Sequence, residues 1–212
     1  MVGPYALLFA RTLIIGLLVA APVGAMGVLC IQRTLAHGWR AGMATGAGIA
    51  SADAIYAGLA AFGLTTVSHW MVAYQAYIRI VGGLALLWLG WRAIATTPPA
   101  RDAARAIDSR RLKSLYVSAI GLTLTNPMTI MFFAAIFAGA GLAAQARTGG
   151  AIAVTLGVTC GSLSWWIALT TGVSAVRHAM SERVMSVVNR VSGGMVIAFG
   201  LFAVISGALR FA

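Results

Sequence analysis

Six long apolar segments dominate the sequence and limit the kind of fold that it can adopt. They cover residues 5–29, 42–66, 71–94, 115–142, 149–173 and 184–209. A helix needs about 20 predominantly apolar residues to cross a bilayer, and each segment is long enough. Only 9% of the residues are charged, whereas about a quarter are charged in a typical soluble domain. The sequence therefore predicts an all-α membrane protein with six transmembrane helices.

The basic residues are distributed unevenly between the connections. Of the 15 Lys and Arg residues, eleven lie in or beside the first, third and fifth connections, and four lie on the opposite side. Cytoplasmic loops are enriched in Lys and Arg, so we expect a multi-pass protein of the plasma (inner) membrane with both termini outside. Topology and anionic lipid headgroups then account for the net charge of +11. We expect no nucleic-acid partner, because no long hydrophilic segment offers a binding face.

Two halves of the chain share sequence features. Residues 79–83 (RIVGG) resemble residues 190–194 (RVSGG), and Pro22 and Pro127 interrupt the first and fourth apolar segments. A unit of three helices contains an odd number of spans, so the second unit must lie inverted relative to the first. We therefore predict two inverted-topology three-helix repeats. They would comprise a first repeat at 1–95, a cytoplasmic linker at 96–114 and a second repeat at 115–212.

Asp53 lies near the middle of the second apolar segment, whereas the other acidic residues lie in hydrophilic stretches. An acidic side chain at the bilayer centre costs about 2.5–3.5 kcal/mol on insertion scales. Such residues usually face a protein interior or a water-filled path and have a functional role. We expect Asp53 either to pair with a substrate ammonium group or to exchange a proton during transport. The alternative is a structural carboxylate that pairs with a backbone donor or an arginine.

The two prolines predict a binding site between the halves. Proline lacks an N–H group and frees backbone groups inside the bilayer, where protein, water or a ligand must satisfy them. We predict a substrate site formed by Pro22 and Gly24 of the first break, Asn126 and Pro127 of the second, Asp53 and Trp165. Asn126 would bind a substrate carboxylate or a freed backbone carbonyl; both roles stay open. Trp165, Trp166, Ser162 and Ser164 align with Asp53 in the second half, so this half has no matching acid.

Several segments, in their order along the chain, resemble the lysine exporter and homoserine/threonine exporter family (LysE/RhtB type). The relevant segments are Pro22-Val23-Gly24-Ala25, Arg33-Thr34-Leu35-Ala36-His37-Gly38, Ala52-Asp53-Ala54, Leu86-Leu87-Trp88-Leu89-Gly90-Trp91, Leu124-Thr125-Asn126-Pro127 and Asn189-Arg190-Val191-Ser192-Gly193-Gly194. The family pattern Pro-x-Gly-Pro has a second proline where this chain has Ala25. The resemblance implies export of amino acids or related small solutes, driven by an ion gradient.

These observations predict a transporter rather than an enzyme. The expected function is secondary active export, by alternating access, of an amino acid or a related zwitterionic or cationic solute. A proton gradient would drive this export, with Asp53 as the coupling group. The expected partners are this solute and membrane lipids, with a homo-oligomer left open, and no cofactor or bound metal is expected. A divalent metal exporter and a non-transporting membrane scaffold are the alternatives, although no ligand cluster with metal-binding spacing is present.

Overall fold

The computed structural model describes residues 3–21, 24–62, 74–95, 108–126, 129–130, 132–133, 148–177 and 182–209. These residues form an all-helical structure, and none of them lies in a strand. The helices with assigned bounds are α1 (Pro4–Ala20), α2 (Ala25–His37), α3 (Trp39–Ala61), α5 (Gln75–Ala95), α6 (Ser109–Leu124), α8 (Thr148–Arg177) and α9 (Glu182–Ala208). The predicted all-α class is therefore confirmed for the described part of the chain.

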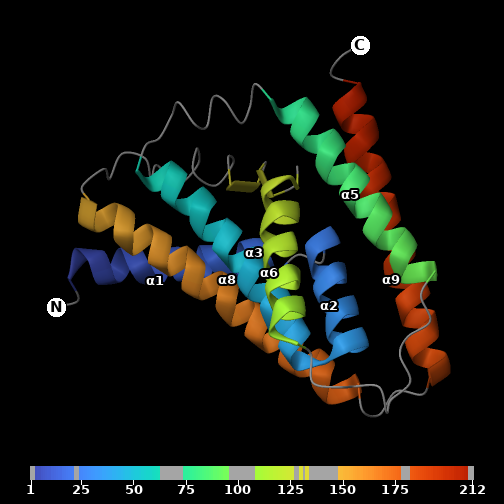
Figure 1. Ribbon diagram of the computed structural model, residues 1–212. Helices are drawn as coiled ribbons and strands as arrows, with labels where there is room; N and C mark the ends of the chain where they lie inside the picture. The colour runs from blue at the N-terminus through green and yellow to red at the C-terminus, as the bar shows by residue number, and fades with distance from the viewer. Residues whose placement is uncertain are drawn as a thin grey trace.

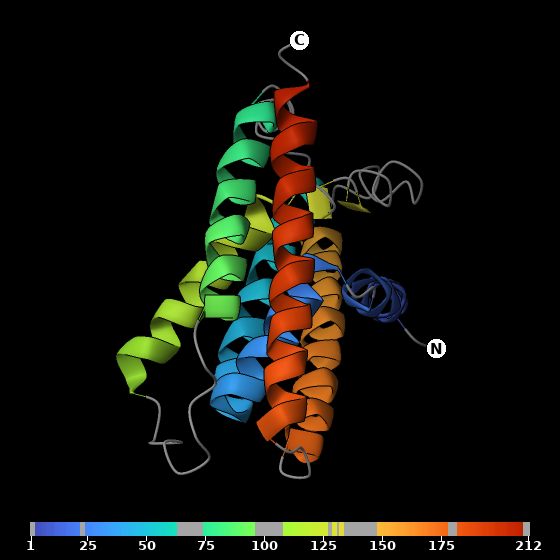
Figure 2. The same ribbon diagram turned by 90° about the vertical axis from the view of Figure 1, so that its right-hand side faces the viewer.

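The helices pack as two groups with α2 between them (Figure 1). In one group α8 packs against both α1 and α3, and α3 also packs against α6. The other group is the pair α5 and α9, which lie side by side along their length in both views (Figures 1 and 2). The short helix α2 contacts α3 and α8 on one side and α9 on the other. Thus α2 joins the two groups at the centre of the molecule.

The first apolar segment folds differently from the single interrupted span that the sequence predicts. Helix α1 ends at Ala20, and α2 begins at Ala25 and continues to His37, eight residues beyond the predicted end at Leu29. The sequence prediction placed the polar residues after Leu29 in a connection. Gln32, Arg33 and Thr34 are nevertheless buried within the continuing helix. Arg33 donates hydrogen bonds to α3 and α6, and the Thr34 hydroxyl donates to the Cys30 carbonyl one turn back.

Gly38 forms the whole connection between α2 and α3. Its φ of 87° lies in the left-handed region, which glycine adopts without steric cost. Its N–H group donates a hydrogen bond to the carbonyl of Thr34 and closes the last turn of α2. This single-residue turn lays α2 directly against the start of α3.

Two helices end close to the predicted proline breaks. Helices α1 and α2 meet at an angle of 76° across Ala21–Gly24, and α6 ends at Leu124 with Thr125 as its C-cap. Pro22 and Pro127 themselves lie outside the described residues. Helical backbone resumes at residues 129–130 and 132–133.

Length and composition identify membrane-crossing candidates among the described helices. Residues Thr148–Arg177 and Arg190–Ala208 are each long and apolar enough to span a bilayer, and α1 with α2 would make a third, bent span. The remaining apolar segments are also helical over much of their described length, in α3, α5 and α6. Helix α6 begins at Ser109, within the predicted linker, while residues 96–107 lie outside the described part.

Small residues allow α5 and α9 to approach closely. An added Cβ at Gly83 would lie 2.7 Å from the carbonyl oxygen of Gly200, and one at Gly90 would lie 2.8 Å from that of Gly193. A Cβ at Gly207 would lie 2.9 Å from the carbonyl oxygen of Ala76. Along this series the residue number rises on α5 as it falls on α9, so the two helices run antiparallel. Close backbone approach of this kind is how membrane helices associate.

We expect Gly200→Ala to destabilise the protein and Gly194→Ala, on the same helix, to leave it unchanged or slightly more stable. A methyl group at Gly200 would lie 2.8 Å from the carbonyl oxygen of Gly83, whereas nothing lies within 4 Å at Gly194. Overpacking costs about 1–3 kcal/mol, while relief of a helical glycine contributes about 0.5–1 kcal/mol. Thermal unfolding in detergent measures the difference. A Gly200→Ala protein as stable as Gly194→Ala would contradict the close contact.

Candidate functional site

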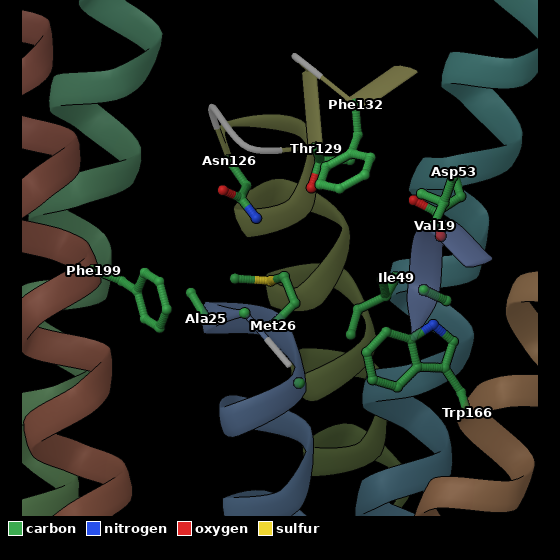
Figure 3. A pocket seen from close by; sticks show the side chains of 13 residues that line it. Val19, Ala25, Met26, Ile49, Asp53, Asn126, Thr129, Phe132, Trp166 and Phe199 are labelled. Carbon is green, nitrogen blue, oxygen red and sulfur yellow. The ribbon is translucent and has the colours of Figure 1, made fainter. Parts of the chain in front are cut away.

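A cavity of about 100 Å³ lies where α2, α3, α8, α9 and the end of α6 meet (Figure 3). An engineered apolar cavity of about 150 Å³ accommodates benzene, so the volume suits part of a small solute. Three of the predicted site residues line it, namely Gly24, Asp53 and Asn126. Pro22 and Pro127 lie outside the described residues. Trp165 does not line the cavity and packs beside it, whereas its neighbour Trp166 is part of the wall.

Asp53 is held by a short chain of hydrogen bonds from α8. The Ser162 hydroxyl donates to Oδ2 of Asp53 at 2.6 Å, and Nε1 of Trp166 donates to the Ser162 oxygen at 3.1 Å. All three side chains are buried, and Asp53 is only 3% exposed. Ser162 and Trp166 are four residues apart, so they share one face of α8. This face lies against the Asp53 face of α3.

The charge of Asp53 is not balanced by a nearby cation in the described part of the chain. Asp53 is buried and accepts a hydrogen bond from the Ser162 hydroxyl. No described arginine, lysine or histidine interacts electrostatically with it. A buried ionised carboxylate with one neutral hydrogen bond is costly. A proton or a cationic group that enters the cavity would remove that cost. The arginine partner considered as a structural alternative is therefore not found among the described residues.

The cavity wall combines apolar side chains with a few polar ones. In Figure 3, Asp53 and Trp166 lie on one side, Phe199 of α9 lies opposite, and Met26 of α2 extends between them. Asn126 and Thr129 line the wall after the end of α6. Such a wall of apolar side chains with a few convergent polar groups is typical of small-molecule sites.

Tyr56 connects the Asp53 helix to the interrupted end of α6. Its hydroxyl donates a 2.7 Å hydrogen bond to the carbonyl of Leu124, the last residue of α6. That carbonyl is among those that a helix end leaves without an intrahelical partner. The Tyr56 ring also stacks on Phe133, with ring centroids 5.3 Å apart. Tyr56 thus fixes both sides of the second break relative to α3.

Sequence reasoning missed Tyr56 and the burial of Arg33. Tyr56 follows Asp53 by three residues, a spacing that places both on one helix face and could have indicated a shared role. Arg33 was assigned to a connection, but it lies in α2 with 7% exposure. The signal for it was Gly38, a C-terminal helix stop well beyond the end of the apolar segment.

No group of three or more His, Cys, Asp or Glu side chains that could hold a metal ion occurs among the described residues. Among these residues, the side-chain hydrogen-bond partner of Asp53 is the hydroxyl of Ser162.

Comparison with known proteins identifies the family. The family model described as LysE type translocator matches residues 17–207, nearly the whole chain. The chain belongs to the LysE type translocator family. As a translocator, this LysE-type chain is a multi-pass membrane transporter and not an enzyme. The expected family resemblance is thereby confirmed.

Curated relatives match this LysE-type chain over much of its length. It is 34% identical to the uncharacterized membrane protein YahN of Escherichia coli (strain K12), over 88% of this chain and 84% of the relative. It is 32% identical to the homoserine/homoserine lactone efflux protein of Salmonella typhi, over 61% and 62%. The threonine efflux protein of the same organism is 25% identical, over 75% and 79%. No solved structure matches the chain.

We expect Ser162→Ala to lower thermal stability in detergent more than Ser164→Ala does. The first change removes the hydrogen bond to Asp53 and the acceptor of Trp166, both buried. Leaving a buried polar group unsatisfied costs about 1–3 kcal/mol. The control hydroxyl is exposed and bonds only to the Cys160 carbonyl of its own helix. Equal melting temperatures for the two variants would show that the Asp53–Ser162 contact does not contribute to stability.

Proposed function

We propose that this chain is a secondary active transporter that exports an amino acid, or a related small zwitterionic or cationic solute, from the cytoplasm. The observation that carries the proposal is Asp53, a buried carboxylate at the wall of a cavity, which no cation balances among the residues that the structure describes. The relatives named as homoserine/homoserine lactone and threonine efflux proteins support the same class of solute.

The two ends of an amino acid would bind different parts of the cavity. The ammonium group pairs with the Asp53 carboxylate. The carboxylate group lies at the start of α2, where Gly24 is the N-cap and provides no side-chain hydrogen bond to the first turn. The first N–H groups of a helix lack intrahelical partners, and its dipole favours an anion there. Asn126 offers an additional amide, and Phe199 and Met26 contact the solute side chain.

We further propose the inverted-repeat architecture and alternating access. Helices related by an inverted repeat should run in opposite directions, as α5 and α9 do. Helices α3 and α8 also run antiparallel: Gly42 lies near Thr170, Gly46 near Trp166, and Gly58 near Thr155. Helices α5 and α9 correspond to the third and sixth predicted apolar segments, and α3 and α8 correspond to the second and fifth. Rocking of one repeat against the other would expose the cavity to each side in turn.

The orientation of this transporter follows from its basic connections. His37 at the end of α2 lies within hydrogen-bond distance of Arg111 at the start of α6, with Nη2 and Nε2 2.5 Å apart. A Cβ at Gly38 would lie 3.1 Å from Nη1 of Arg177, at the end of α8. The three basic connections therefore meet at one end of the molecule, which supports a common cytoplasmic side. Both termini would then face outward.

Proton coupling is proposed for Asp53. A buried carboxylate that meets either a proton or a substrate ammonium group exchanges one for the other without a large change in the charge of the cavity. Inward movement of a proton would then drive outward movement of the amino acid. The single neutral hydrogen bond from Ser162 is compatible with both forms, because a hydroxyl can donate to a carboxylate or accept from a carboxylic acid.

We expect Asp53→Asn to lower export by at least tenfold, while Asp108→Asn leaves it unchanged. The first change removes the anion that attracts the ammonium group, and each 1.4 kcal/mol lost is a factor of ten. Asp108 is exposed at the start of α6 and does not line the cavity. The assay measures counterflow of labelled threonine, homoserine and leucine in proteoliposomes, with equal protein insertion verified.

The same assay separates the two roles of Asp53. If Asp53→Asn keeps counterflow but no longer accumulates solute under a pH gradient, Asp53 carries the proton only. Undiminished counterflow and gradient-driven transport would reject Asp53 as a functional residue. Wild-type protein that exchanges none of the amino acids tested would reject the amino-acid class.

A further inference from the structure

Arg33 links three helices at the end of α2 that lies away from the cavity. Its Nη1 donates to the Leu115 carbonyl of α6 at 3.1 Å and to the Thr45 hydroxyl of α3 at 3.3 Å. Its Nη2 donates to the Ser118 hydroxyl of α6 at 3.0 Å. The planar guanidinium group is suited to such simultaneous contacts, because its donors point in fixed directions. Arg33 therefore ties α2 to α3 and α6.

These contacts satisfy the hydrogen bonds of Arg33 but do not neutralise its charge. It donates hydrogen bonds to two hydroxyls and a carbonyl, and no carboxylate acts on it among the described residues. With 7% of its surface exposed, it is a largely buried cation. Burial of a cation without a counter-ion carries a desolvation cost that neutral hydrogen-bond partners offset only in part. This makes the contact suitable for reversible release.

Helix α2 extends from the cavity to the basic end of the molecule. Its first residues, Gly24 to Gly27, line the cavity, and Arg33 and His37 lie further along the same helix. Cys30 lies on α2 between Gly27 and Arg33 and is fully buried. Its Sγ lies 3.6 Å from the Gly42 carbonyl of α3. The path from the cavity to that end therefore runs along an interface that α2 fills.

We propose that Arg33 is a positioning residue that latches α2 against α3 and α6 and closes the cavity toward the cytoplasm. Release of this latch lets α2 move away from α3 and opens the cavity to the cytoplasmic side. The inference rests on the proposed transport function for its direction. It adds a residue that does not touch the solute, and it identifies α2 as the moving element.

The native cysteines allow a direct test without substrate. Cys160→Ser removes the other thiol, which is exposed on α8, and leaves Cys30 as a reporter of separation between α2 and α3. Alkylation by N-ethylmaleimide is then measured in membranes by intact mass. We expect Arg33→Gln to raise the rate at Cys30 at least fivefold, and Ser118→Ala about twofold. Arg110→Gln, an exposed arginine on α6, is the matched control and should have no effect.

Solute dependence separates a latch from a merely structural contact. In the protein with Arg33 intact, the transported amino acid should raise Cys30 alkylation as the carrier cycles. In Arg33→Gln that increase should be absent, because the interface is already open. A general loss of stability would instead raise alkylation in both conditions and lower the melting temperature. If Arg33→Gln does not fold, Ser118→Ala decides the same question.

Two results would overturn the inference. One is a Cys30 rate in folded Arg33→Gln and Ser118→Ala equal to that of the intact protein. The other is an equal increase in Arg110→Gln. Counterflow by the intact protein reports on the proposed function independently. If the intact protein transports amino acids but the Arg33 and Ser118 variants show unchanged Cys30 alkylation, only the latch is rejected. If these variants show altered alkylation but the intact protein transports no solute, only the proposed function is rejected.

Discussion

The candidate site depends on one contact between two helices that are distant in the sequence, the hydrogen bond from Ser162 of α8 to Asp53 of α3. It places a carboxylate in a buried cavity wall where only a neutral hydroxyl supports it. Such a group is more stable with a proton or a cation beside it than alone. In the proposed transport cycle, the energetic cost of burying Asp53 would favour binding of either a proton or a cationic group in the cavity.

The surrounding helices position this carboxylate and give it access. The interruptions after α1 and α6 bring the start of α2 and Asn126 to the cavity, and Tyr56 holds the carbonyl at the end of α6. Helix α2 packs between the α5–α9 pair and the remaining helices. Because Gly24 to Gly27 line the cavity and Arg33 lies further along the same helix, a movement of α2 would affect both the site and its access. The proposed transport cycle therefore couples binding at one end of α2 to release at the other.

Local sequence patterns predicted most helices and part of the site. The apolar segments located the helices, and the isolated acid Asp53 indicated a residue of the cavity wall, because both signals depend on the bilayer as solvent. The proline pattern correctly indicated where α1 and α6 end, although the prolines lie outside the described residues. The long α2 was missed because its polar residues are satisfied by distant partners, such as Leu115 and Ser118 for Arg33. The choice of Trp166 over Trp165 as a cavity residue depends on the rotation of α8, which a pair of adjacent tryptophans does not specify.

The central claim is that the substrate occupies the cavity beside Asp53, and carboxyl modification tests it most directly. Dicyclohexylcarbodiimide reacts with protonated carboxyl groups in apolar surroundings, and mass spectrometry locates its adduct. The account predicts one adduct at Asp53 that forms several times more slowly in the presence of the transported amino acid. An adduct at Asp53 whose rate is unaffected by saturating amino acid would contradict the account.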